Sequence, residues 1–227
     1  MNHKLLNYLV FILFIGFFQS CTNDDGEYSV EEKATFEAEI NDVPITLIES
    51  DIISDTAIFW MPSRQIRNVE PDYTIDIWSL GLGKSFSPNL SLSSRLTVDF
   101  VNHFVSSQYL ADAKISRALF EEVLSEGEKE YTPNNNDFPG ISIQWIDADG
   151  ELWASGSPYP REDSSIDTDK DSENYFIINY SEPKDAQAII GTYSQYLDIS
   201  FQCRLYNWKG ESIVMKNARL KYICSIF

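Results

Sequence analysis

A two-residue alternation of apolar and polar side chains constrains the fold of this chain more than any other feature. In residues 34–40, Phe36, Ala38 and Ile40 alternate with Glu37 and Glu39. Successive side chains of a β-strand point to opposite faces of a sheet, so this period indicates a strand with one buried and one solvated face. Phe, Trp and Tyr, which favour strands over helices, make up 14% of the chain. The pattern therefore predicts a fold rich in β-structure.

Similar strand signals recur along the chain, separated by loops rich in Pro, Ser, Asn and Gly. The candidate strands are residues 34–40, 43–48, 57–61, 73–80, 95–101, 141–145, 152–155, 175–180, 189–206 and 212–227. From about Leu110 to Ser125 the spacing is helical instead, because Ile115, Leu119 and Val123 recur every four residues. Such a helix packs against a sheet or binds a partner. We predict an all-β fold, an antiparallel β-sandwich of roughly 9–10 strands with one short helix.

The turn Asp147-Ala148-Asp149-Gly150 joins two candidate strands into a hairpin. With the glycine as a bulge, Trp145 lies opposite Trp153 on the same face of the sheet. Cross-strand aromatic pairs of this kind usually belong to a core.

A second turn, Asn207-Trp208-Lys209-Gly210, sets the register of the last two strands. It places Cys203 opposite Met215 or Lys216, and Cys224 opposite Ser194 or Gln195. The two sulfur atoms would then be roughly 27 Å apart along the strands, at ~3.3 Å per residue. A disulfide tolerates Cα atoms at most about 7 Å apart, so we predict two buried free thiols.

The N-terminal segment has the parts of a secretory signal peptide: the basic Lys4, an apolar run from Leu5 to Phe18, and the small Ser20 before a cleavage point. The run is too short to span a bilayer, which needs about 20 apolar residues. We predict three parts: a signal peptide (residues 1–20), Cys21 with an acidic tether (residues 21–33), and a single β-sandwich domain (residues 34–227).

The sequence around Cys21 resembles the lipobox of bacterial lipoproteins, in which the cysteine becomes the lipidated first residue. Phe18 and Gln19 differ from the commoner residues, and the looser lipoboxes of Bacteroidetes are more similar. In those proteins an acidic pair such as Asp24 and Asp25 is associated with export to the outer face of the outer membrane. The resemblance implies an outer-membrane protein attached to the membrane by a lipid anchor and displayed at the cell surface.

Both ends of the predicted domain resemble small domains of unknown function in Bacteroidetes lipoproteins. The start, Phe36-Glu37-Ala38-Glu39-Ile40-Asn41 followed by Pro44, is similar to their opening strand. The segments Ile190-Gly191-Thr192-Tyr193 and Lys216-Asn217-Ala218-Arg219-Leu220 are similar to their closing strands. The resemblance implies a β-sandwich on a tether, and it implies no activity.

The charge of the chain excludes some partners. There are 17 Lys and Arg residues against 35 Asp and Glu, a formal net charge of −18. Such a charge repels nucleic acid and disfavours binding to anionic lipid surfaces, so we predict no nucleic-acid partner.

Catalytic residues are sparse. Of the two histidines, His3 belongs to the signal peptide, which leaves His103 for any Ser-His-Asp triad. No nucleophile elbow accompanies it, and ligands for a structural zinc site are too few. The many carboxylates give no strand pattern typical of glycosidases. We therefore predict that the protein is not an enzyme.

An acidic stretch offers a weak calcium motif. Asp167, Asp169 and Asp171 occupy alternate positions, as hard oxygen ligands do in a calcium loop. Ser172 replaces the turn glycine, and Ile178 stands where a bidentate glutamate belongs. Calcium is one interpretation of this segment, and a solvated loop without a cofactor is the other.

Two aromatic residues are candidates for ligand binding. Trp208 occupies a turn position, where a large ring gains little packing, and Tyr159 lies between Pro158 and Pro160. A flat ring with one polar edge suits the apolar face of a sugar. We therefore expect a non-enzymatic binding module for a glycan or another macromolecule. The alternative is a structural lipoprotein that packs against other envelope proteins through an apolar patch or an open sheet edge.

Overall fold

The computed structural model describes residues 33–49, 58–60, 63–70, 73–84, 94–105, 117–132, 138–156, 173–184 and 193–226. The chain divides into two compact units, residues 1–32 and 33–227, and every described residue belongs to the second unit.

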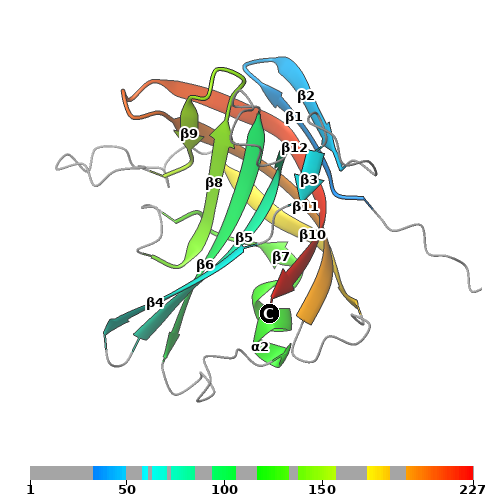
Figure 1. Cartoon of the computed structure of the whole chain (residues 1–227), viewed down its shortest axis with the longest axis vertical. Coiled ribbons are helices and arrows are strands. Elements are labelled where there is room, and N and C mark those ends of the chain that lie inside the picture. The colour runs from blue at the N-terminus through cyan, green and yellow to red at the C-terminus, as the bar shows by residue number, and fades with distance from the viewer. Residues whose placement is uncertain are drawn as a thin grey trace, which may run out of the picture. The chain divides into compact units, whose positions relative to one another are not determined.

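Within the described ranges the second unit contains twelve strands and one short helix (Figure 1). The helix is α2 (Arg117–Val123). The strands are β1 (Thr35–Ile40), β2 (Val43–Ile48), β3 (Ile58–Trp60), β4 (Ser63–Glu70), β5 (Tyr73–Lys84), β6 (Arg95–Val105), β7 (Gly127–Glu128), β8 (Gly140–Ile146), β9 (Leu152–Ala154), β10 (Tyr175–Lys184), β11 (Tyr193–Tyr206) and β12 (Ser212–Ile226).

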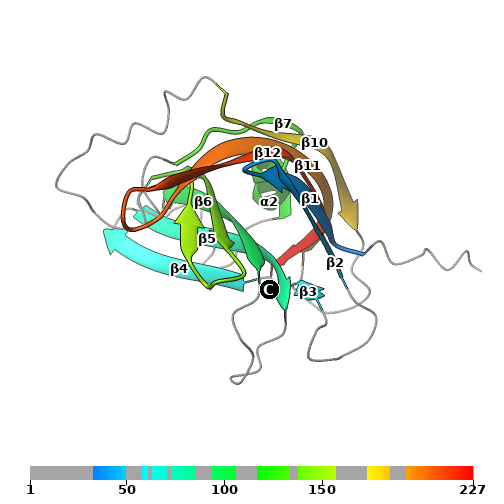
Figure 2. The same ribbon diagram turned by 90° about the horizontal axis from the view of Figure 1, so that it is seen from above.

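The strands form one antiparallel sheet in the order β2-β1-β12-β11-β9-β8-β6-β5-β3. β10 pairs with β11 and β7, and β4 pairs with β5. Seen from above, the sheet folds over on itself, with β1, β10, β11 and β12 in one layer and β5, β6 and β8 in the other (Figure 2). The predicted all-β, sandwich-like fold is confirmed.

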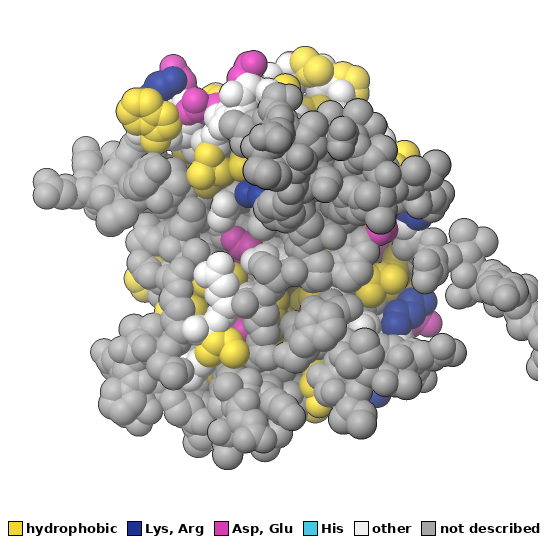
Figure 3. Space-filling model, in the orientation of Figure 1, with side chains coloured by type: hydrophobic (Ala, Val, Ile, Leu, Met, Phe, Trp, Pro, Cys, Tyr) yellow, Lys and Arg dark blue, Asp and Glu magenta, His cyan; other side chains and the backbone are white. Residues whose placement is uncertain are grey.

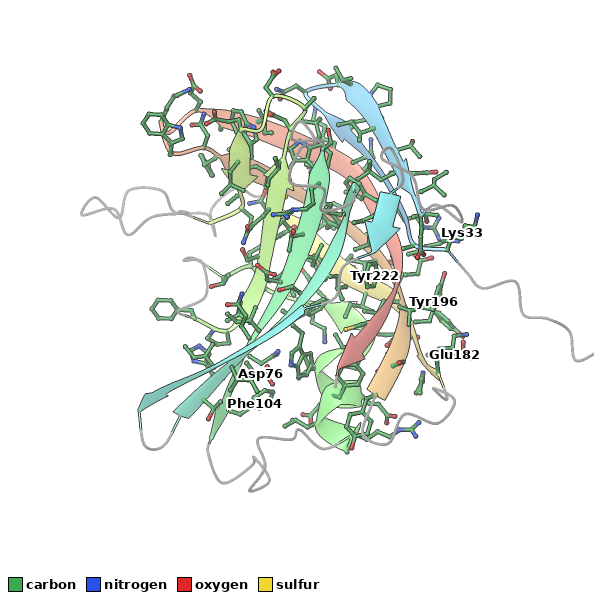
Figure 4. All side chains as sticks on the ribbon, in the orientation of Figure 1. Lys33, Asp76, Phe104, Glu182, Tyr196 and Tyr222 are labelled. Carbon is green, nitrogen blue, oxygen red and sulfur yellow. The ribbon has the colours of Figure 1, made fainter. Side chains whose placement is uncertain are left out.

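The core lies between the two layers because the inward positions of each strand are apolar. Phe36 of β1 stacks on Phe201 of β11 and also contacts Trp145 of β8, with ring centroids 6.2 Å apart in both pairs. Near the middle of the fold, the Tyr222 hydroxyl of β12 donates a hydrogen bond to the Gly81 carbonyl of β5 at 3.4 Å (Figure 4). The two layers therefore share one hydrophobic core.

Helix α2 covers one end of this core. The ring of Phe120 lies 5.1 Å from that of Trp78 on β5 and 6.2 Å from that of Tyr193 on β11. The sequence predicted a helical face of Ile115, Leu119 and Val123, of which Ile115 lies outside the described residues. Phe120 and Leu124 are instead the most deeply buried, while Leu119 and Val123 pack at the edge of the core.

Two described strands, β4 and β7, were not predicted. In β4, Ser-Arg-Gln-Ile-Arg-Asn-Val-Glu, no apolar face repeats, and Gln65 and Ile66 are exposed. The strand forms because its backbone pairs with β5, and backbone pairing leaves no apolar repeat in the sequence. β7 has two residues and pairs with β10.

Candidate functional site

Trp208 is 61% exposed, as its turn position predicted. The turn that carries it is held by the neighbouring Asn207, which is only 1% exposed. The Asn207 Oδ1 atom accepts hydrogen bonds from the backbone N–H groups of Lys209 and Glu211, at 3.0 and 2.9 Å. The Asn207 Nδ2 group donates to the Glu211 carboxylate at 2.6 Å. The polar contacts of Asn207 therefore shape the turn and leave the Trp208 ring largely in solvent.

The turn between β8 and β9 has the same geometry. Asp147 Oδ1 accepts from the N–H groups of Asp149 and Glu151, at 3.0 and 2.9 Å. In both turns the glycine, Gly150 or Gly210, has a φ of 83°, a conformation that favours glycine. We call these two segments, residues 147–151 and 207–211, the paired turns.

The paired turns lie side by side because β9 pairs with β11 through Ala154 and Tyr206. The Lys209 ammonium contacts both turns, since Nζ lies 5.4 Å from the centroid of the Trp208 ring and 4.0 Å from Glu151 Oε2. Figure 3 shows hydrophobic, basic and acidic side chains together at this corner of the molecule. The structure thus brings together two segments, residues 147–151 and 207–211, that begin 60 residues apart in the sequence.

The other described tryptophan side chains are not comparable with Trp208. Trp78 and Trp145 are 1% and 2% exposed. Trp145 pairs with Trp153 across the hairpin, which confirms the predicted register. Trp153 packs at the edge of the core and donates its indole N–H to Asp147 Oδ2 at 2.9 Å. This bond ties the first of the paired turns to its own strand.

Exposed rings also occur elsewhere in the described part of the chain. Phe138, just before β8, is 49% exposed, and Tyr180 of β10 is 46% exposed. Neither residue carries a sequence signal for exposure, because Tyr180 lies within a strand pattern and Phe138 follows a polar loop. Tyr180 contacts the buried Tyr196, with ring centroids 6.2 Å apart.

The predicted thiols are confirmed. Cys203 and Cys224 are buried and free, and they lie opposite Met215 and Gln195 in the β11–β12 ladder. Burial raises the pKa of Cys203 to about 12 and raises the pKa of Cys224 further. Neither thiol is a ready nucleophile, because nucleophilic attack requires the thiolate.

His103 lies on β6, opposite Ile75 of β5, and its Nε2 atom is buried with no hydrogen-bond partner. A buried carboxylate that the sequence did not suggest lies on the same strand. Asp99 is 4% exposed and accepts a hydrogen bond from Gln144 Nε2 at 3.0 Å. Burial raises the pKa of Asp99, and hydrogen bonds from Ser79 and Gln144 oppose this shift. Its side chain is therefore embedded in the sheet rather than presented to solvent.

Several predicted residues lie outside the described ranges: Cys21, Tyr159, Asp167, Asp169 and Asp171. Their roles in lipid attachment, ligand binding and calcium binding stay predictions. Among the side chains that the structure does describe, no group of three or more His, Cys, Asp or Glu could hold a metal ion. In the same ranges, no helix is both long and apolar enough to cross a membrane. Comparison with protein-family models, with curated proteins and with solved structures gave no match.

Proposed function

We propose that this chain is a lipid-anchored surface protein of the outer membrane that binds a glycan, without a chemical step, through Trp208. The observation that carries the proposal is that Trp208 is 61% exposed on a turn shaped by a buried asparagine. Indole supplies a flat apolar face and one N–H donor, which suit the stacking face and the hydroxyl groups of a sugar. It supplies neither a nucleophile nor a proton-transfer group.

The exposed ring area is large enough to support measurable binding. A tryptophan side chain contributes about 200 Å² when it is fully covered, so roughly 120 Å² of Trp208 is open to a ligand. At about 25 cal/mol per Å², covering that area is worth about 3 kcal/mol, or roughly a hundredfold in Kd. Losses of ligand freedom reduce this figure, which fits weak single-site binding.

The turn also limits the entropy lost on binding. Two hydrogen bonds to Asn207 Oδ1 and one from Asn207 Nδ2 hold the backbone on both sides of Trp208. A side chain on a pre-organised turn loses less freedom when a ligand orders it than a side chain on a floppy loop.

Attachment to the membrane follows from the proposed lipidation of Cys21. Two or more acyl chains give stable anchoring, whereas a single chain binds marginally. Metabolic labelling with palmitate tests this step: the parent chain should take up label and Cys21→Ser should not. Protease shaving of intact cells then tests display at the surface.

The binding experiment uses residues 22–227 on a glycan array, followed by calorimetry with the best ligands. We expect Trp208→Ala to weaken binding by at least tenfold and Trp208→Phe to retain most of it, because the stacking face survives. Phe138→Ala is the matched control, since it removes another exposed ring from a different segment. An array blank for the parent protein, or binding unchanged by Trp208→Ala, would remove the proposal.

A second function is favoured by a separate observation at β2. Among the described strands β2 pairs only with β1, and its Val43 and Ile48 side chains are 60% and 49% exposed. An edge strand with apolar side chains is a surface on which another envelope protein could pack, although Pro44 removes one edge donor. Crosslinking in cells tests this: Val43→Lys with Ile48→Lys should abolish partner crosslinks, and Gln65→Lys, at an exposed position of the separate strand β4, should not.

A further inference from the structure

We infer that the ligand of the paired turns carries an ammonium group, and that its recognised unit is an amino sugar with a free amine. This inference rests on the proposed function, because it names the class of glycan that Trp208 binds. It is drawn from the position of Lys209 and from the charge around the ring.

The protein's own ammonium occupies the place where such a ligand would bind. Lys209 Nζ lies 5.4 Å from the centroid of the Trp208 ring and 4.0 Å from Glu151 Oε2. An aromatic face attracts a cation within about 6 Å of its centroid, and a nearby carboxylate adds to that attraction. Because Lys209 is exposed and has a flexible stem, a ligand ammonium can take its place.

The surroundings of Trp208 favour a cation over an anion. The paired turns contain four acidic residues and one basic residue. Asp147 and Glu211 each accept hydrogen bonds within their own turns, and Asp149 and Glu211 are exposed. Acidic sugars would therefore meet like charge, and a protonated amine would meet opposite charge.

A second lysine in the described part of the chain has similar contacts, but with a buried ring in place of the exposed Trp208. Lys184 Nζ also lies 5.4 Å from a ring centroid, that of Tyr196, and 2.8 Å from Glu182 Oε2. Tyr196 is only 7% exposed, so this ring has no open face for a ligand. Figure 4 shows Tyr196 and Glu182 at the far side of the fold from the paired turns. The two lysines therefore form a matched pair for experiment.

The test compares three tetrasaccharide probes by calorimetry at low salt: glucosamine, N-acetylglucosamine and galacturonate. They present similar rings with an ammonium, a neutral amide or a carboxylate. We expect glucosamine to bind roughly two- to fivefold more tightly than N-acetylglucosamine, with galacturonate weakest. High salt should reduce the advantage, because the paired turns are exposed.

Two variants test the role of Lys209 directly. Lys209→Met removes the internal competitor and should tighten glucosamine binding severalfold, with little change for N-acetylglucosamine. Glu151→Gln should reduce the preference for glucosamine. Lys184→Met and Glu182→Gln are the controls and should leave all three affinities unchanged.

The outcomes separate this inference from the proposed function. Equal binding of glucosamine and N-acetylglucosamine, both lost in Trp208→Ala, would overturn the inference and leave the proposed function standing. Weaker glucosamine binding in Lys209→Met, or tighter binding of galacturonate, would also overturn it. No binding of any probe, together with a blank glycan array, would remove both. Equal binding of a lysine-rich peptide would identify a basic protein segment as the ligand and overturn the choice of sugar.

Discussion

Asn207 offers the sharpest test of how the paired turns are built. Its side chain is buried, accepts two backbone N–H groups through Oδ1 and donates to Glu211 through Nδ2. Asn207→Ala removes all three hydrogen bonds and leaves the two backbone N–H groups without these acceptors. The N–H groups of Lys209 and Glu211 belong to exposed residues, so water recovers part of the loss.

The magnitude follows from the three bonds. Two neutral hydrogen bonds contribute about 1 kcal/mol each, and the bond to the exposed Glu211 carboxylate adds about 1 kcal/mol after screening. We therefore expect Asn207→Ala to lower the free energy of unfolding by about 3 kcal/mol. For a domain of this size that corresponds to a fall in Tm of roughly 6–12 °C.

The assay is thermal unfolding of residues 22–227 followed by circular dichroism and by the Trp fluorescence spectrum. The double variant Asn207→Asp with Glu211→Gln keeps the Oδ1 acceptor and reverses the donor and acceptor of the third bond, so it should recover most of the Tm. Asp already occupies the corresponding place in the first of the paired turns. Ser212→Ala, an exposed change on the same hairpin, should shift Tm very little. A change of less than about 1 °C in Asn207→Ala would refute the assignment of these bonds as stabilising.

Three further predictions concern a buried carboxylate, the two buried thiols and a pair of glycines. Burial raises the pKa of Asp99 above its value in the unfolded chain, so Asp99 stabilises the fold at low pH and this contribution is lost as pH rises through the raised pKa. The Tm of the parent should therefore fall as pH rises above the unfolded-state pKa of Asp99, and the Tm of Asp99→Asn should fall less. Equal dependence of Tm on pH in the parent and the variant would contradict this. Cys203 and Cys224 should react with an aromatic disulfide reagent at pH 8 only after denaturation, since burial raises both pKa values; rapid labelling of the native protein would show that the thiols are accessible. In chemical denaturation, Gly140→Ala should lower the free energy of unfolding more than Gly127→Ala. Both glycines have a positive φ, but only at Gly140 would an added Cβ meet backbone atoms, the nearest at 2.8 Å. Equal losses in the two variants would show that the strain of a positive φ alone sets the cost.

Sequence patterns predicted the structure correctly where a feature depends only on one hairpin, that is, on two neighbouring strands and the turn between them. The Asp-Ala-Asp-Gly turn predicted that Trp145 faces Trp153, and the structure has this pair. The Asn-Trp-Lys-Gly turn predicted that Cys203 and Cys224 lie far apart in the ladder, and both are free. Turn type and register follow from neighbours in sequence, since a hairpin is a local structure.

Helix α2 shows where such patterns lose accuracy. The periodicity marked Leu119 and Val123 as the buried face, while Phe120 and Leu124 enter the core most deeply. These two pairs of residues lie next to each other on the helix surface. Phe120 enters the core because its ring fits between Trp78 and Tyr193. That space belongs to β5 and β11, whose mutual position is set by the whole sheet.

The sequence by itself determined the strand class, the two hairpin registers and the exposure of Trp208, because alternation and turn chemistry act over a few residues. Only the tertiary structure decided that the two turns lie together. Their contact depends on the pairing of Ala154 with Tyr206, and so on the order in which distant strands join the sheet. The same long-range packing buries Asp99, although the alternation of Val98 and Phe100 around it assigns Asp99 to the solvated face of its strand. Sheet order is set by the burial of all strands at once, which no single stretch of sequence encodes.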